Sequence, residues 1–109
     1  MELDKEYIAK FIEFFEAVLA RPLMYFGKYD TDAVVLFTHG LYISLSITNH
    51  SFPGIEIYKE VSKNRNWHFN ALGIIPDMKE KGLSDEKMVK ELISVEIEAW
   101  KVFQDSFEN

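Results

Sequence analysis

The chain contains no cysteine and no long uninterrupted apolar run. The absence of cysteine excludes disulfide bonds and thiolate chemistry, and a small domain without covalent cross-links suits a reducing compartment. The most apolar stretch, residues 32–48, is interrupted by Thr38, His39 and Ser44, whereas a membrane-spanning helix needs roughly 20 apolar residues. The first residues, MELDKEYIAK, are acidic and amphipathic, unlike a signal peptide. We therefore expect a cytoplasmic protein that does not cross a membrane.

Basic side chains are few relative to acidic ones. Lysine and arginine number 12 against 18 aspartates and glutamates, which gives a net charge of −6. Non-specific nucleic-acid binding depends on basic residues that neutralise phosphates, so this balance argues against a nucleic-acid partner. It is compatible with a basic protein partner, and equally with an acidic protein whose charge serves only solubility.

Recognisable catalytic and metal-binding motifs are absent as well. The sequence has no G-x-G-x-x-G, P-loop, G-x-S-x-G or H-E-x-x-H pattern. The three histidines, His39, His50 and His68, are not spaced as metal ligands. We therefore expect no enzyme, no metal and no cofactor. His39 stays open as a general base, although a histidine on an apolar helix is more often a hydrogen-bonded core residue.

Hydrophobic residues make up 48% of the chain and include nine phenylalanines, which is enough for one core. Their spacing predicts helices that are bounded by proline, glycine and capping residues. The predicted fold is all-α, a single domain of residues 1–109 with four to five helices around a central helix at 32–48 that is apolar on every side. The expected elements are helices at 3–20, 32–48, 54–63, 76–81 and 85–107, a loop at 21–32, and irregular chain or a helical turn at 66–75.

Glu96 is the one residue that breaks the pattern of its helix. It lies within the apolar stripe of the helix expected at 85–107. A buried carboxylate needs a partner, and Arg21, fixed in orientation beside Pro22, is the arginine of the first half of the chain. We predict a buried structural pair of Arg21 and Glu96. The alternative is that Glu96 is a general acid or base with a raised pKa.

The segment Arg21-Pro22-Leu23-Met24-Tyr25-Phe26-Gly27 has two resemblances. It is similar to the RPGMYIG segment of the type II topoisomerase ATPase domain, but Leu23 replaces the motif glycine. The catalytic glutamate, the magnesium-binding asparagine and the glycine-rich ATP loops that should follow are missing, so ATP binding is rejected. The segment also resembles the R-P-x-M-Y-x-G segment of small bacterial immunity-type proteins, which carry F-x-x-G in the next helix, here Phe37 and Gly40.

Immunity proteins of this kind are compact, acidic and cytosolic, and each binds a secreted toxin domain so that the toxin's active site is covered. The resemblance therefore implies an antitoxin whose partner is a cognate toxin, such as a basic nuclease, and this mechanism needs no catalytic residue. Two alternatives stay open: a small enzyme that uses Glu96 and His39, and an oligomeric structural or regulatory protein.

Acidic and aromatic side chains at the start of the helix expected at 32–48 and around the turn at Gly82 are the candidates for contact with such a partner. Acidic residues steer a basic partner, and aromatic residues anchor it. The candidates are Tyr29, Asp30, Asp32, Asp77, Glu80, Asp85 and Glu86.

Overall fold

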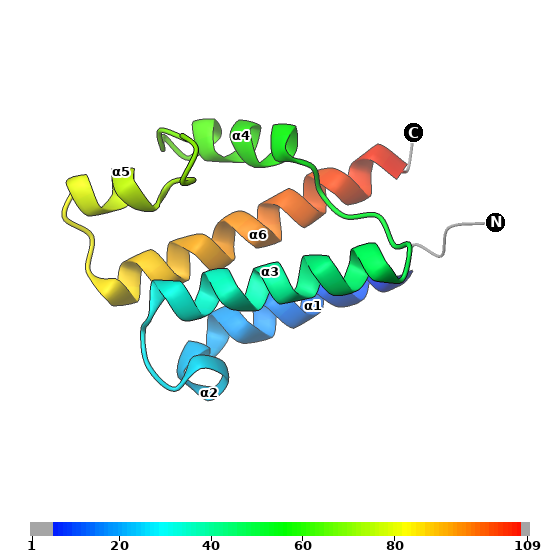
Figure 1. Cartoon of the computed structure of the whole chain (residues 1–109), viewed down its shortest axis with the longest axis horizontal. Helices are drawn as coiled ribbons and strands as arrows, with labels where there is room; N and C mark the ends of the chain where they lie inside the picture. The colour runs from blue at the N-terminus through cyan, green and yellow to red at the C-terminus, as the bar shows by residue number, and fades with distance from the viewer. Residues whose placement is uncertain (1–5, 108–109) are drawn as a thin grey trace.

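The computed structural model describes residues 6–107, which form helices and no strand (Figure 1). The all-α prediction is confirmed, and residues 3–5 of the first expected helix lie outside the described part. Within residues 6–107, no helix combines the length and hydrophobicity that a membrane crossing requires. The six helices are α1 (Glu6–Ala20), α2 (Pro22–Phe26), α3 (Thr31–Ile47), α4 (Ile55–Asn64), α5 (Ile75–Glu80) and α6 (Asp85–Phe107).

Helix α6 is the centre of the fold. It packs against α1, α3 and α4, and Figure 1 shows it running between α4 on one side and α1 and α3 on the other. Its Trp100 is fully buried. The indole stacks on Phe11 of α1, with ring centroids 4.9 Å apart, and on Tyr42 of α3, with centroids 6.5 Å apart. Because large aromatic side chains dominate the energetics of a core, Trp100 is the main link of α6 to α1 and α3.

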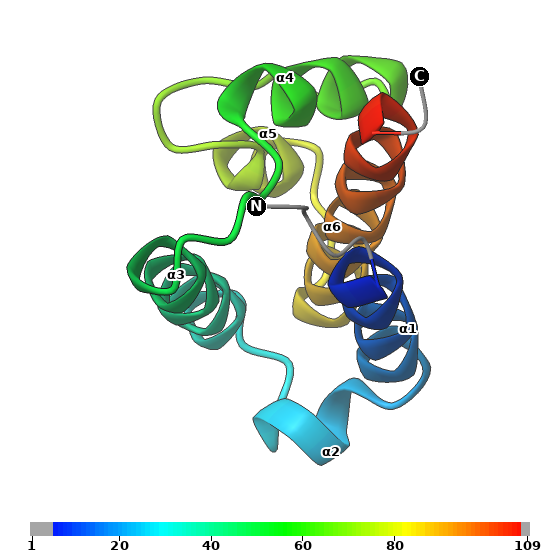
Figure 2. The same cartoon turned by 90° about the vertical axis from the view of Figure 1, so that its right-hand side faces the viewer.

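The prediction that residues 32–48 form the central helix, buried on every side, is wrong. Helix α3 does turn Val34 and Leu45 toward the core. However, Leu36, Ile43 and Ile47 are 72%, 60% and 75% exposed. Figure 2 shows α3 at the edge of the molecule, with the other long helices all to one side of it. Among the long helices, α6 takes the central place and packs against α1, α3 and α4, whereas α3 packs mainly against α6.

The expected loop at 21–32 contains a short helix, α2, so this part of the prediction is also wrong. Pro22 occupies the first turn of α2, where a fixed φ suits the helix and the missing N–H leaves no bond unmade. Gly27 ends α2 with a φ of +77°, a value that disfavours residues with a Cβ. The side chain of Asp30 caps α3 by accepting from the backbone N–H of Asp32 at 2.9 Å.

Residues 66–74, which the sequence left open between irregular chain and a helical turn, are irregular, and Ile75 is the first residue of α5. Asn70 and Gly73 exchange two backbone hydrogen bonds of 3.1 and 2.9 Å, and the side chain of Asn70 accepts from the N–H of Leu72 at 2.8 Å. Gly73 has a φ of +77°, which closes this turn. The turn packs near α4 and α6 and forms one wall of the cleft described below.

A charged clamp joins the end of α4 to α6. Arg65 donates to both carboxylate oxygens of Glu91, at 2.5 and 2.8 Å, and to Glu98 at 2.5 Å. Trp67 donates from its indole to Glu91 at 2.7 Å. The hydrogen bonds from Arg65 lower the pKa of Glu91. The bidentate pairing of Arg65 with Glu91 is the strong form of an arginine–carboxylate interaction and fixes the position of α4 along α6.

The clamp predicts that Arg65→Ala lowers the free energy of unfolding by about 2 kcal/mol, because Glu91 then stays half-buried without its cation. Urea denaturation measures this change. Lys59→Ala on the same helix is the control, since Lys59 is exposed and makes one 3.6 Å pair with Glu56; it should change stability by less than about 0.5 kcal/mol. Equal losses in the two variants would contradict the clamp.

Candidate functional site

A cleft of about 460 Å³ lies between α3, α4 and α6, with the turn at 69–75 as its fourth wall. This volume is within the range of small-molecule binding sites, roughly 300 to 1,000 Å³. The walls are mostly aliphatic and aromatic, and the few polar groups come from three different helices. The lining includes His39, Tyr42, Tyr58, Ser62, Phe69, Leu92, Val95 and Glu96.

Glu96 supplies the carboxylate of the cleft. Its Oε1 accepts hydrogen bonds from the hydroxyl of Tyr42 and, at 2.8 Å, from the hydroxyl of Tyr58. The two hydroxyls also touch each other, and the indole of Trp100 donates to the Tyr42 oxygen at 3.3 Å. One carboxylate oxygen of α6 therefore joins α3 and α4. The other oxygen, Oε2, has no hydrogen-bond partner among residues 6–107.

The carboxyl group of Glu96 is desolvated without a cation beside it. Burial raises its pKa to about 7, although the hydrogen bonds from Tyr42 and Tyr58 act in the opposite direction. Burial and the neighbouring carboxylate also raise the pKa of both tyrosines, which therefore remain protonated donors. A carboxyl group of this kind can hold or release a proton near neutral pH.

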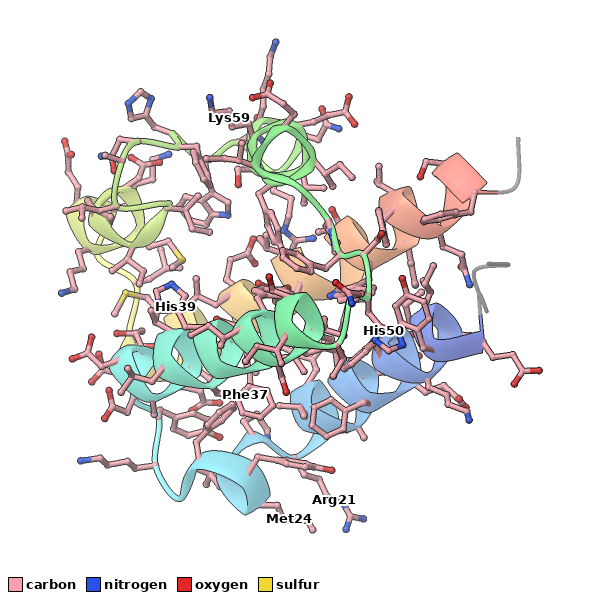
Figure 3. The ribbon with its side chains drawn as sticks, turned by 45° about the vertical axis from the view of Figure 1, so that its right-hand side comes forward. Arg21, Met24, Phe37, His39, His50 and Lys59 are labelled. Carbon is pink, nitrogen blue, oxygen red and sulfur yellow. The ribbon has the colours of Figure 1, made fainter. Side chains whose placement is uncertain are left out.

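The predicted buried pair of Arg21 and Glu96 is wrong. Arg21 is exposed between α1 and α2, and its side chain points away from the body of the molecule (Figure 3). The irregular position of Glu96 in its stripe did indicate desolvation, but tyrosine hydroxyls take the place of a guanidinium. Tyr42 and Tyr58 fit the apolar pattern of their helices as core aromatics, so that pattern does not reveal them as hydrogen-bond donors.

Besides Glu96 and the two tyrosines, the polar side chains of Thr38, His39 and Ser62 line the cleft. Ser62 is fully buried, and its Oγ has no hydrogen-bond partner in the described part of the chain. His39 is exposed on the side of α3 that faces the cleft, whereas Phe37 leaves the helix on the opposite side (Figure 3). His39 and Glu96, the residues of the enzyme hypothesis, therefore line the same cleft.

The structure gathers most of the predicted partner-binding residues at one end of the molecule. Tyr29, Asp30 and Asp85 surround a hollow of about 330 Å³ where α3 and α6 begin. Glu86 pairs with Lys90 at 2.7 Å, and the ammonium of Lys90 lies 6.0 Å from the ring centroid of Tyr29. These four candidates, together with the exposed Asp32 in the first turn of α3, are called the acidic end below.

The remaining two candidates belong to α5. Glu80 is exposed at the end of that helix. The carboxylate of Asp77 accepts from the backbone N–H of His68 at 2.8 Å and from the ammonium of Lys81 at 3.0 Å. These two contacts lower the pKa of Asp77. Asp77 therefore fastens α5 to the irregular chain before it, a role that the sequence did not indicate.

One surface was missed at the sequence level. Leu36, Ile43 and Ile47, with Gly40 between them, follow one side of α3 at helical spacing and form its outer face. Contiguous exposed apolar side chains mark an interaction surface, whereas scattered ones are ordinary. An apolar hollow of about 480 Å³ adjoins α3 on its α1 side. It is lined by Tyr7, Lys10, Phe11, Phe14, Phe37 and Leu41.

No family model, curated protein or solved structure matches the chain. Within residues 6–107 there is also no cluster of three or more acidic, histidine or cysteine side chains that would hold a metal ion. Two features of the chain itself bear on its function, the outer face of α3 and the cleft around Glu96.

The raised pKa of Glu96 predicts a contribution to stability that depends on pH. The pKa of Glu96 is about 7 in the folded state and 4.5 for an ordinary glutamate. A carboxyl group with a raised pKa contributes its full stabilisation of the fold below pH 4.5 and loses it as pH rises through about 7. The interval between the two values corresponds to about 3 kcal/mol.

Glu96→Gln removes this titration and keeps an acceptor for both tyrosines. Between about pH 4 and about pH 8, the unchanged protein should lose about 3 kcal/mol of unfolding free energy that the variant does not lose. Urea denaturation at a series of pH values measures the difference. Glu13→Gln, at an exposed position of α1, is the control and should give a curve parallel to that of the unchanged protein. A parallel curve for Glu96→Gln would refute the assignment.

Proposed function

We propose that the chain is a protein-binding inhibitor, an immunity protein that acts as an antitoxin by covering the active site of a cognate bacterial toxin in the cytoplasm. The proposal depends on one observation: the apolar side chains Leu36, Ile43 and Ile47 on the outer face of α3 are exposed to solvent. Inhibition by coverage needs no catalytic group, in agreement with the absence of catalytic motifs from the sequence.

The outer face has the surroundings of a protein interface. Such interfaces combine an apolar centre with a polar rim and pockets that receive aromatic or aliphatic anchors of the partner. The apolar hollow between α1 and α3 lies along one flank of α3 and is of a size to accept an anchor side chain. The outer face of α3 would give a partner a contact area, and the apolar hollow would receive one of the partner's side chains.

The acidic end continues the outer face at the start of α3. Asp32 and Leu36 are four residues apart and therefore lie on the same side of the helix. Acidic groups at the edge of an apolar patch accelerate encounter with a basic partner, and salt weakens this effect. A basic toxin, such as a nuclease, fits the charge of this end and the net charge of −6.

A second candidate function is supported by one observation, the presence of His39 and Glu96 in the same cleft. In that case the chain is a small enzyme that uses the pair as general acid and base. Substitutions on the outer face would then leave its function unchanged. A third candidate, an oligomeric regulatory protein, would use the outer face to bind a second copy of the chain.

Co-expression with the product of the reading frame immediately upstream tests the proposal. A toxin–inhibitor pair should co-purify, and the purified chain should be monomeric in analytical ultracentrifugation and should abolish toxin activity. A stable homo-oligomer whose assembly is lost in outer-face variants would favour the third candidate instead.

Ile43→Asp combined with Ile47→Asp should weaken toxin binding at least about 100-fold, because the centre of the interface would then bury charges without partners. Calorimetry measures the affinity, and circular dichroism checks that helicity is retained. Ile55→Asp is the matched control, since Ile55 on α4 is 61% exposed against 60% for Ile43 but lies off the outer face. If all of these variants bind as the unchanged protein does, the interface lies elsewhere.

Charge reversal at the acidic end should act on the association rate. Asp32→Lys combined with Asp85→Lys is expected to slow toxin association about tenfold at low salt while the dissociation rate changes little. The cap of α3 is kept, since Asp30 provides it. Stopped-flow measurements at two salt concentrations give both rates. An unchanged association rate would remove the acidic end from the interface.

A further inference from the structure

We propose that the cleft around Glu96 is a binding site for a primary ammonium group carried on an apolar stem. This inference does not rest on the proposed protein-binding function, because its residues face the space between α3, α4 and α6. It begins from the position of the carboxylate, which lies in the cleft with one oxygen engaged and the other without a partner in residues 6–107.

The geometry of the carboxylate selects the shape of the cation. Both tyrosine hydroxyls donate to Oε1, so a ligand has one oxygen, Oε2, left to approach. A guanidinium binds best to two oxygens at once through parallel hydrogen bonds, whereas an ammonium is compact and binds a single oxygen well. The site therefore favours an ammonium over a guanidinium.

The buried serine provides a second acceptor. Ser62 lines the same cleft and is fully buried, and its Oγ has no hydrogen-bond partner in the described part of the chain. A buried polar group without a partner costs free energy that a ligand can recover. An ammonium carries three donors and a hydroxyl can accept, so an ammonium in the cleft that reaches Ser62 would satisfy its oxygen.

The walls suit the rest of such a ligand. The cleft is lined by the aromatic rings of Tyr42, Tyr58 and Phe69, whose faces attract cations. Aliphatic side chains of α6, Leu92 and Val95, complete the wall and would cover an apolar stem. A cationic head on a hydrocarbon chain therefore matches both parts of the cleft.

Binding to this site should depend on pH. The titratable groups that line the cleft with Glu96 are His39 and Tyr42 from α3 and Tyr58 from α4, and the turn at 69–75 contributes none. Both tyrosines stay neutral because their pKa values are raised. Glu96 attracts the cation only when ionised, so the affinity should rise as pH increases through about 7.

The test compares n-hexylamine with n-hexanol, which has the same stem and no charge. Both are titrated into the ¹⁵N-labelled protein, and the shifts of amides around the cleft and of the Trp100 indole are followed by NMR. At about pH 8, hexylamine should bind at least about tenfold more tightly than hexanol, as expected for a hydrogen bond to a charged group. That advantage should fall about tenfold by about pH 6.

Glu96→Gln should abolish the preference for hexylamine, and Glu13→Gln, an exposed position on α1, should retain it. If Glu96→Gln does not fold, the pH series on the unchanged protein still decides the matter. Equal binding of hexylamine and hexanol at about pH 8 would overturn the proposal, because the free carboxylate then contributes nothing. So would a preference that survives in Glu96→Gln.

A blocked peptide, acetyl-Gly-Lys-Gly-amide, distinguishes the two sources of an ammonium on an apolar stem. Shifts at the same cleft residues with this peptide would assign the site to a lysine side chain of a protein. Shifts with hexylamine alone would assign it to a free small amine. Either result supports the site, and the absence of shifts with both probes overturns it.

Discussion

The properties of the cleft depend on how one carboxylate is held. Glu96 reaches Tyr42 on α3 and Tyr58 on α4 through a single oxygen, so three helices meet at this oxygen. Neutral hydroxyls stabilise the ionised carboxylate less than a cation does, and burial therefore raises the pKa to about 7. A guanidinium from Arg21 would have compensated the charge and closed the carboxylate to other ligands.

Helix α3 contributes to both the cleft and the outer face, because other helices cover only one side of it. On its inner side, Tyr42 donates to the carboxylate of Glu96. The side chains on its two flanks point in different directions, His39 toward the cleft and Phe37 toward α2 (Figure 3). Its outer face carries Ile43 and Ile47 into water. A protein on the outer face and a ligand in the cleft would therefore contact different sides of one helix, and neither would have to displace the other.

The sequence predicted what local signals determine. Helix ends are such signals: Pro22 stops the first helix at Ala20, as the sequence predicted, and the capping side chains of Asp30 and Ser84 precede α3 and α6. The exposure of α3 could not be predicted in the same way. A helix that is apolar on every side has the same sequence pattern whether other helices of its own chain or a partner protein cover it. The partners of Glu96 lie 54 and 38 residues away in sequence, and a stripe pattern carries no information about such pairings.

The choice of glutamate at position 96 argues for a role beyond holding helices together. Glutamine would accept from Tyr42 and Tyr58 just as well and would carry no charge to desolvate. At neutral pH the glutamate costs about 3 kcal/mol relative to such a neutral group, a large fraction of the stability of a small domain. The nearby Glu91 has no such cost, because Arg65 compensates its charge with two hydrogen bonds. Residues that break local rules without compensation are expected where function requires them, and Glu96 and the unpartnered Ser62 are residues of this kind in the cleft.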